Sequence, residues 1–294
     1  MITRALSAAL MIVAHTIAST AAHAQETDLI TPGAKVQRVA TGFGFLEGPA
    51  SDADGAVYFS DVVNQRIHRW SAETGITTFR ENTGRANGLR VDVDGTLLVC
   101  EMDNRQVTAI GPDGVVTVLA DTFEGQRFNS PNDLWVDPSG GIYFSDPSYG
   151  PTDDLEIKGN HVYYLAPDRE TLSQVTTDLI QPNGIIGTPD GSRVYIADQG
   201  AGRLWAYRPA ADGSLTDKRL FVAQGADGLT MDERGNLYVT GQDVTIFDPA
   251  GEPIASIGVP EPPANLTFGG PEGMTLFITA RTSLYRVDML VTGQ

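Results

Sequence analysis

One short pattern recurs six times along the chain, and it limits the fold more than any other feature of the sequence. Each copy is a turn rich in glycine and acidic residues, followed by a strand of β-branched and aromatic residues, which is typical of a β-hairpin. Repeats of several short strands without helical periodicity predict the blades of a β-propeller rather than a solenoid of strands and helices. The turns lie at residues 52–55, 92–95, 137–141, 189–191, 232–235 and 270–273.

A polar residue stands a few positions before each turn, where the inner strand of each blade begins. Because the inner strands of a propeller surround a central channel, equivalent residues of the blades face one another at one mouth. The sequence therefore predicts a ring of two carboxylates and four amides around the axis. These ring residues, which lie between 38 and 51 residues apart, are Glu47, Asn87, Asn132, Asn183, Asp227 and Asn265.

The two ends of the repeat array predict how the ring closes. The last repeat shows only three strands and ends at residues 283–287, whereas segment 35–40 precedes the first repeat as a spare strand. We expect this segment to pair into the last blade, because that pairing removes a free sheet edge. The predicted fold is all-β, a single six-bladed β-propeller domain over residues 25–294 with an N-terminal strand closing the last blade.

Residues 1–24 have the features of a secretory signal peptide. Arg4 provides a positive charge, residues 5–17 are mostly apolar, and Ala22-His23-Ala24 is a small-residue cleavage site. The protein is therefore predicted to be periplasmic or secreted. The only cysteine, Cys100, lies in an apolar run and is predicted to be a buried thiol.

The charge balance limits the partners of the protein. The sequence has 20 Lys and Arg against 37 Asp and Glu, for a formal net charge of −17. Nucleic acids and anionic membranes attract basic surfaces, so neither is expected as a partner. A small molecule or a cation fits this composition better.

The ring residues have the chemistry of a cation site. Carboxylates that face one another in a buried channel repel and lose hydration, and a hard divalent cation offsets both effects. Ca²⁺ prefers oxygen ligands such as carboxylates and amides, and the ring holds no cysteine or histidine of the kind zinc prefers. We expect one Ca²⁺, with Mg²⁺, Mn²⁺ or Zn²⁺ as substitutes, held by Glu47, Asn183, Asp227 and Asn132. The alternative is that these residues are only turn formers.

Other residues are placed near the same mouth. Asn132 and Asn87 are candidate substrate contacts, and Arg127 either neutralises a substrate oxyanion or forms a surface salt bridge. The third repeat carries an insertion, and loop 147–160 is a candidate lid. Four acidic residues at the ends of second strands either support the ring or form turns, and they are Asp61, Glu101, Asp146 and Asp198.

The sequence lacks the usual parts of a nucleophilic hydrolase. The histidines beyond the signal segment, His68 and His161, lie on strands away from the axis, and no Gly-x-Ser-x-Gly motif occurs. Metal-assisted hydrolysis remains, in which the cation polarises a carbonyl or phosphoryl oxygen and a carboxylate activates water. Asp227 is the candidate base.

Five motifs in order resemble the regucalcin/gluconolactonase family. They are Phe-Leu-Glu-Gly-Pro at 45–49, Asn-Ser-Pro-Asn-Asp at 129–133, Phe-Ser-Asp-Pro at 144–147, Gln-Pro-Asn-Gly at 181–184 and Ala-Asp-Gly at 226–228. The resemblance implies a six-bladed propeller with Ca²⁺ or a similar ion at Glu47, Asn183 and Asp227. It also implies a substrate or metal contact at Asn132 and a proton-transfer role for Asp227.

The resemblance implies hydrolysis of a lactone, because family members open sugar lactones and relatives hydrolyse other lactones or organophosphate esters. Sugar lactonases of the regucalcin type have an arginine two residues before the substrate asparagine, where this chain has Ser130. The resemblance therefore supports the metal site in this chain more strongly than it supports specificity for a sugar. An esterase or organophosphate hydrolase on the same site is one alternative, and a non-catalytic, Ca²⁺-stabilised binding propeller is another.

Overall fold

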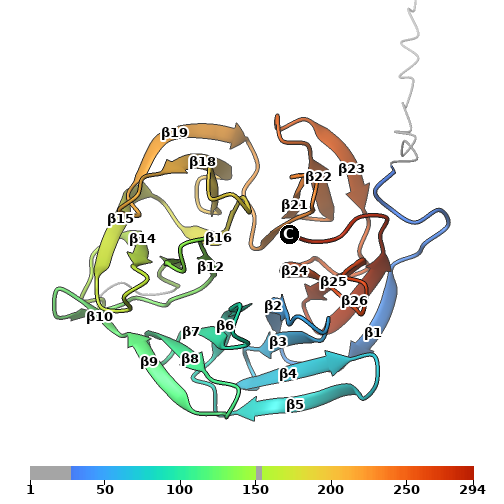
Figure 1. The fold of residues 1–294 in the computed structure, drawn as a ribbon, viewed down its shortest axis with the longest axis horizontal. Helices are drawn as coiled ribbons and strands as arrows, with labels where there is room; N and C mark the ends of the chain where they lie inside the picture. Colours follow the sequence, from blue (N-terminus) through green and yellow to red (C-terminus); the bar gives the residue numbers. More distant parts are fainter. Residues whose placement is uncertain (1–27, 150–153) are drawn as a thin grey trace, which may run out of the picture.

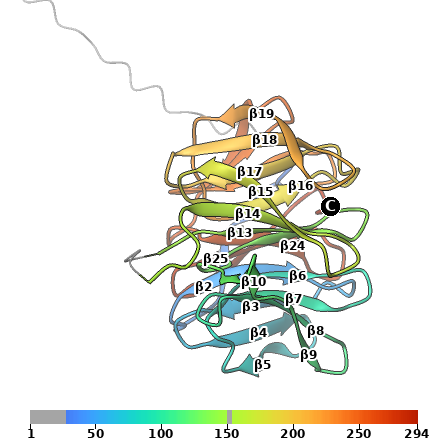
Figure 2. The same cartoon turned by 90° about the vertical axis from the view of Figure 1, so that its left-hand side faces the viewer.

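The protein is described by a computed structural model that covers residues 28–149 and 154–294. Its strands form six four-stranded sheets around a central axis (Figure 1). Seen edge-on, the strands run between the two faces of the ring (Figure 2). The predicted six-bladed β-propeller is confirmed. The predicted signal peptide, residues 1–24, and positions 25–27 of the predicted domain lie outside the described residues.

Each blade is an antiparallel sheet whose strands follow the chain from the axis outward. Blade 1 contains β2 (Leu46–Ser51), β3 (Val57–Asp61), β4 (Arg66–Ser71) and β5 (Gly75–Glu81). Blade 2 contains β6 (Ala86–Val91), β7 (Leu97–Glu101), β8 (Gln106–Ile110) and β9 (Val116–Ala120). Blade 3 contains β12 (Leu134–Val136), β13 (Ile142–Asp146), β14 (Asn160–Leu165) and β15 (Leu172–Leu179).

The second half of the ring repeats this order. Blade 4 contains β16 (Pro182–Gly187), β17 (Val194–Asp198), β18 (Arg203–Pro209) and β19 (Leu215–Val222). Blade 5 contains β20 (Leu229–Met231), β21 (Leu237–Thr240), β22 (Val244–Phe247) and β23 (Pro253–Ile257). Blade 6 contains β24 (Asn265–Gly269), β25 (Thr275–Ala280) and β26 (Ser283–Asp288). A short hairpin, β10 (Thr122–Phe123) with β11 (Gln126–Arg127), lies between blades 2 and 3 in the chain.

The N-terminal strand closes the ring as predicted. β1 (Gln37–Thr41) pairs antiparallel with β26 and is the outermost strand of blade 6. Packing across the closure supports the pairing, since the rings of Trp70 in blade 1 and Phe277 in blade 6 have centroids 4.5 Å apart. The strand runs from 37 to 41 rather than over the predicted 35–40.

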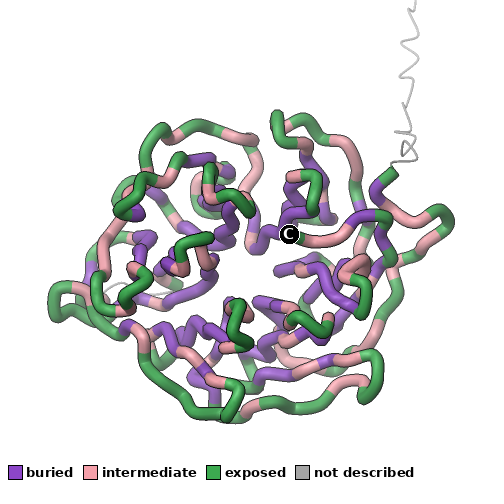
Figure 3. Tube along the Cα trace, viewed as in Figure 1, coloured by how far each residue is buried: buried purple, intermediate pink, exposed green. Residues whose placement is uncertain are grey.

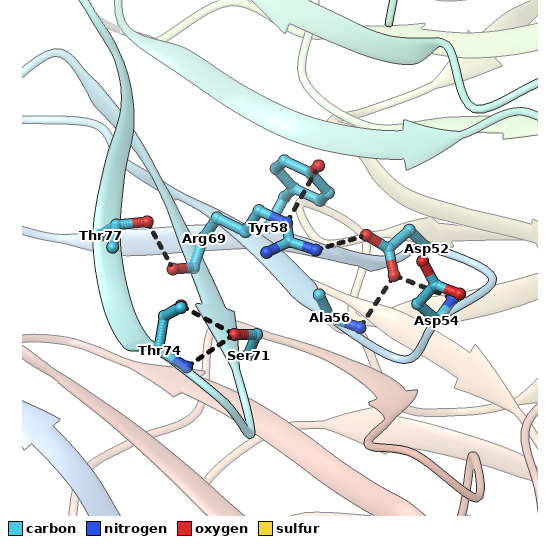
Figure 4. Close-up of polar contacts among 8 residues, drawn as sticks. All are labelled: Asp52, Asp54, Ala56, Tyr58, Arg69, Ser71, Thr74 and Thr77. Carbon is cyan, nitrogen blue, oxygen red and sulfur yellow. Dashed lines mark hydrogen bonds and ion pairs between the residues drawn. The ribbon is translucent and has the colours of Figure 1, made fainter.

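The recurring acidic turn is explained by its own hydrogen bonds (Figure 4). In blade 1, Asp52 Oδ1 accepts the backbone N–H of Asp54 at 3.1 Å and that of Ala56 at 2.8 Å. Its other oxygen forms an ion pair with Arg69 at 3.1 Å, and Arg69 also donates to the Tyr58 hydroxyl. An aspartate that bonds to its own turn fixes a tight hairpin, and Asp137 and Asp232 do the same in blades 3 and 5.

The core lies between the blades and close to the axis (Figure 3). In blade 4, every residue of β16 and β17 is buried, whereas β19 is largely solvent-facing. Inner strands are covered on both faces by neighbouring blades, so their burial is nearly continuous rather than alternating, even at a polar position such as Asn183. Within the described ranges, no helix is long and apolar enough to cross a membrane.

Candidate functional site

The structure brings five of the six ring residues together around one cavity. The cavity has a volume of about 570 Å³ and is lined by Glu47, Asn87, Asn132, Asn183 and Asp227, among others. Asn265 is not among the lining residues, and its amide instead donates to the Asp133 carboxylate at 3.5 Å. The chemistry of the ring is therefore uneven, with both carboxylates and three of the four amides facing the cavity.

Register shifts in the inner strands direct three of these side chains toward the cavity. The register between inner and second strand shifts at Glu47 in β2, beside Asn87 in β6 and beside Asn183 in β16. A bulge of this kind takes a residue out of the regular ladder and redirects its side chain. These three side chains can therefore face the cavity while the rest of each strand packs in the core.

Glycines after the ring residues let adjacent blades approach closely. The N–H of Gly88 donates to the carbonyl of Asn132, and the N–H of Gly184 donates to the carbonyl of Asp227, both at 2.7 Å. A Cβ atom on Gly88 or Gly184 would lie 2.5 Å from the same carbonyl oxygen. Only glycine fits at such a contact, and these bonds between blades set the spacing of the ring residues.

The buried Glu47 and the half-buried Asp227 form a pair of carboxyl groups. Glu47 is 3% exposed, and burial together with the charge of Asp227 raises its pKa well above the ordinary value. Burial also raises the pKa of Asp227, against the hydrogen bond from Asn183, whose Nδ2 lies 2.8 Å from Asp227 Oδ1. The backbone N–H of Asp227 donates to the Thr240 hydroxyl at 3.2 Å, which fixes its position. When both groups are ionised they repel, and a cation between them would relieve that repulsion.

Tyr149 is a site residue that the sequence did not single out. Its hydroxyl accepts the amide of Asn132 at 2.9 Å and the amide of Asn183 at 3.1 Å. Burial of the hydroxyl, with the charges of Asp227 and Glu47, raises its pKa, so it stays protonated. The signal was only its place in the insertion after β13, and no repeat position marks it. Of the predicted lid 147–160, Tyr149, Asp154 and Leu155 line the cavity, and positions 150–153 lie outside the described residues.

Three of the four acidic residues at the ends of the second strands hold the segments that lead into the ring. Each is buried and accepts the backbone N–H of the residue two positions before a ring residue, so it positions that ring residue. Glu101 differs, because it accepts from side chains, including Asn104 at 2.6 Å. The bonded pairs are Asp61 with Phe45 at 3.3 Å, Asp146 with Ser130 at 2.6 Å, and Asp198 with Gln181 at 2.9 Å.

Arg127 does not line the cavity. It is exposed on β11, where its backbone N–H donates to the Glu156 carboxylate at 2.8 Å and its guanidinium donates to the Asn104 carbonyl at 3.3 Å. Arg85 and Arg105 line the cavity instead. Position along the chain suggested Arg127, whereas Arg105 comes from a turn of the neighbouring blade. A substrate contact by Arg127 stays a prediction.

Histidine and cysteine lie away from the cavity. His68 on β4 and His161 on β14 are both buried, and neither lines it. Cys100 is buried as predicted, and burial raises the pKa of its thiol. The polar groups facing the cavity are therefore carboxylates, amides, hydroxyls and arginines.

Comparison with known proteins identifies the family. Residues 45–282 match the family model described as the SMP-30/Gluconolactonase/LRE-like region. The chain belongs to this family. The matched region contains all six ring residues, and in this member of the SMP-30/gluconolactonase family the closing strand β1 lies outside it.

Relatives of this SMP-30/gluconolactonase member cover most of its length. The gluconolactonase of Zymomonas mobilis is 31% identical over 301 residues, covering 90% of this chain and 83% of that protein. Pentonolactonase XacC of Haloferax volcanii is 27% identical over 282 residues, covering 84% and 92%. The solved structure of XC5397 from Xanthomonas campestris, named as a gluconolactonase, has a TM-score of 0.82 at 29% identity, covering 89% of this chain and 91% of that one.

The donor set of this family member suits a hard divalent cation. Glu47 and Asp227 can supply two carboxylates, and Asn183 and Asn132 can supply amide oxygens, which are ligands that Ca²⁺ and Mg²⁺ prefer. In the described part of the chain, no group of three or more His, Cys, Asp or Glu residues is placed to hold a metal ion, so amide oxygens are needed as well. Because Asn183 donates its amide nitrogen to Asp227, ligation by Asn183 requires that amide to turn.

Proposed function

We propose that this protein is a divalent-cation-dependent hydrolase that opens a lactone ring. The observation that carries the proposal is the pair of the buried Glu47 and the half-buried Asp227, which faces the cavity beside the amides of Asn183 and Asn132. Relatives over most of the chain are named gluconolactonase and pentonolactonase, which supports a lactone as substrate. By its N-terminal sequence, the protein acts in the periplasm or outside the cell.

The cation is proposed to be held by Glu47, Asn183, Asp227 and Asn132. Ca²⁺ is the first choice because every donor is an oxygen, and Mg²⁺, Mn²⁺ and Zn²⁺ are the ions to compare. When bound, the cation supplies a Lewis acid that polarises the lactone carbonyl.

Asp227 is the proposed general base and acid. Its partial exposure contrasts with the burial of Glu47, so of the two carboxylates it is the one that water can reach. It accepts a proton from the water that adds to the carbonyl carbon, and returns that proton to the ring oxygen as the bond between that oxygen and the carbonyl carbon breaks. The products are a hydroxyl group and a carboxylic acid, so the added water is fully accounted for.

The amides and Tyr149 are proposed to orient the substrate. Asn87, whose Nδ2 lies 3.2 Å from the Met102 sulfur, and Asn132 face the cavity from neighbouring blades. The Tyr149 oxygen accepts the amide N–H of Asn132, which leaves its own proton to be donated into the cavity. We infer that this proton bonds to an oxygen of the lactone as negative charge develops on it.

A substrate panel tests the proposed function. We expect δ-lactones to be hydrolysed in the presence of Ca²⁺, activity to be lost with a chelator, and activity to return when Ca²⁺ is restored. A simple aryl ester and a phosphotriester belong in the same panel. Turnover of those substrates alone would replace the lactonase with an esterase or organophosphate hydrolase. Ca²⁺ binding without turnover of any of them would favour a non-catalytic propeller.

Replacing Tyr149 with phenylalanine is expected to lower kcat for lactone hydrolysis by roughly 10- to 100-fold, because one donor to the reacting oxygen is lost. The melting temperature should change little, since Tyr149 is 44% exposed and phenylalanine keeps its ring. Tyr163→Phe is a matched control, because the Tyr163 hydroxyl is buried on β14 without a partner in the described chain and does not line the cavity. Equal losses in both variants would argue against donation by Tyr149.

A further inference from the structure

A second cavity lies at the opposite end of the inner strands from the ring residues. It has a volume of about 400 Å³ and is lined by the ends of β2, β6, β20 and β24, together with hairpin 270–273 and residues 292–294. The ring residues stand at or just before the starts of the same strands. Among the described residues, none lines both cavities, so this far cavity is separate from the reaction cavity.

The far cavity contains an arginine without a partner. Arg90 on β6 is half-buried and is the only basic residue among those that line the cavity. Its guanidinium forms no hydrogen bond and no ion pair with any described residue. Burial lowers the pKa of Arg90, against the charges of Asp133 and Asp92, which do not come close enough to pair with it. Because charged groups that leave bulk water are normally paired, an unpaired guanidinium facing a cavity indicates a missing anionic partner.

The acidic residues around this guanidinium already have partners or face solvent. Asp52, which lines the far cavity, forms an ion pair with Arg69 at 3.1 Å (Figure 4). Asp92 forms an ion pair with Arg169 at 3.4 Å. Glu272 lines the cavity from the exposed hairpin 270–273. The protein therefore supplies no counter-ion of its own, in spite of its negative net charge.

Two hydroxyl groups of the far cavity are also without partners. The side chains of Ser51 on β2 and Thr230 on β20 form no hydrogen bond within the described ranges. The unpartnered polar atoms that are sealed off from solvent belong to other residues, so these hydroxyls and the guanidinium remain open to the cavity. β2 and β6 run side by side, because a Cβ atom on Gly48 would lie 2.5 Å from the Cα atom of Gly88. Ser51 therefore stands beside the end of β6, and Thr230 stands across the channel in blade 5.

We propose that the far cavity binds a small oxyanion, with Arg90 donating to its charged oxygens and the Ser51 hydroxyl lying beside them. The planar fork of a guanidinium matches two oxygens of a carboxylate or a sulfate, and such charge-assisted bonds are strong. Thr230 faces the remainder of the ligand across the channel, where it can pair with a hydroxyl of a hydroxy acid. The proposal is independent of lactone hydrolysis, because the two cavities are lined by different residues.

Calorimetric titration of the Ca²⁺-loaded protein at low ionic strength tests the site, with sulfate, gluconate and glycerol as probes. We expect one anion per chain, with a dissociation constant in about the millimolar range or below, and no binding of neutral glycerol. Arg90→Met should weaken anion binding by at least about tenfold, and Arg90→Lys should weaken it less, because lysine keeps the charge and loses only the fork. Tighter binding of gluconate than of sulfate, lost in Thr230→Val, would identify a hydroxy acid, whereas equal or tighter sulfate binding would identify an inorganic oxyanion.

Two arginine variants control for binding elsewhere. Arg105→Met removes an arginine of the reaction cavity, and Arg193→Met removes an exposed arginine that follows the equivalent turn of blade 4 and does not line the far cavity. Each should change the anion affinity by less than about threefold. A loss in either variant as large as that in Arg90→Met would overturn the proposal, because the anion would then occupy the reaction cavity or respond only to net charge. Absence of anion binding by the wild type would overturn it as well.

Melting temperatures give a second, independent readout. An unpaired charge that is partly removed from water destabilises the fold, so Arg90→Met should melt no lower than the wild type when no anion is present. Sulfate or gluconate should raise the melting temperature of the wild type and leave that of the variant unchanged. A variant that melts lower without anion, or that fails to fold, would show that the Arg90 guanidinium already stabilises the protein by itself and would overturn the proposal.

Discussion

Replacing Asp227 with asparagine is expected to lower kcat for lactone hydrolysis by about 10³-fold, within the range for loss of a general acid or base. The amide cannot take the proton of water, yet it matches the carboxylate in shape. The backbone bond from Asp227 to Thr240 and the contact with Asn183 survive the change, so the fold should persist. Kinetics with saturating Ca²⁺, together with the melting temperature, check both parts of the expectation.

Asp133→Asn is the control for this prediction. Asp133 is another buried carboxyl, and its charge contributes to the raised pKa of Glu47. Burial raises the pKa of Asp133 itself to about 7, but Asp133 does not line the cavity. Its loss removes a similar charge from the channel without removing the proposed base. We expect kcat to fall by less than about tenfold in this variant. Comparable losses at Asp227 and Asp133 would mean that channel charge, rather than proton transfer, governs the rate.

The ring residues could be predicted because each occupies the same position in the sequence repeat. Each ring residue stands at the same place before a turn, and the fold converts that place into proximity on the axis. The sequence could not rank the six, because the distinction comes from contacts between blades. Asn265 turns to Asp133, whereas Asn183 bonds to Asp227. Those partners lie on other blades, so no local pattern shows them.

Site residues on loops could not be predicted from the sequence for a different reason. Tyr149 lies in the insertion after β13, and Arg105 lies in a turn where neighbouring repeats carry other residues. Arg127 was chosen by its distance along the chain from Asn132, but the β10–β11 hairpin leaves it exposed outside the cavity. A repeat predicts positions on its strands, whereas loops of unequal length need the packed structure.

Replacing Glu47 with glutamine is expected to abolish the stabilisation of the protein by Ca²⁺. An ion at about 100 times its dissociation constant stabilises the folded state by about 2.7 kcal/mol, which for a domain of this size raises the melting temperature by roughly 5–10 °C. The variant loses one of two charged ligands, so chelation should no longer shift its melting temperature. Scanning calorimetry of both proteins, with Ca²⁺ and with a chelator, measures the difference.

The chelated proteins give the complementary result. Without an ion, Glu47 is buried beside Asp227, and burial together with the charge of Asp227 raises the pKa of Glu47, because two ionised carboxylates there repel. Glutamine removes that repulsion, so the chelated variant should melt no lower than the chelated wild type. A lower melting temperature of the chelated variant would show that Glu47 stabilises the fold directly and that the site is not built around a cation.

The pH dependence follows from the same raised pKa values. Groups whose pKa is higher in the folded state take up protons on folding. This pair therefore lowers the stability of the ion-free protein more and more as the pH rises from the ordinary carboxyl pKa to the raised pKa of the folded state. Cation binding requires the deprotonated carboxylates, so the affinity for the cation also rises with pH. The gap between the Ca²⁺-loaded and chelated melting temperatures should therefore widen from about pH 5 to about pH 7.5 in the wild type. It should stay near zero throughout in Glu47→Gln, and a gap that narrows with rising pH would contradict a cation held by these two carboxylates.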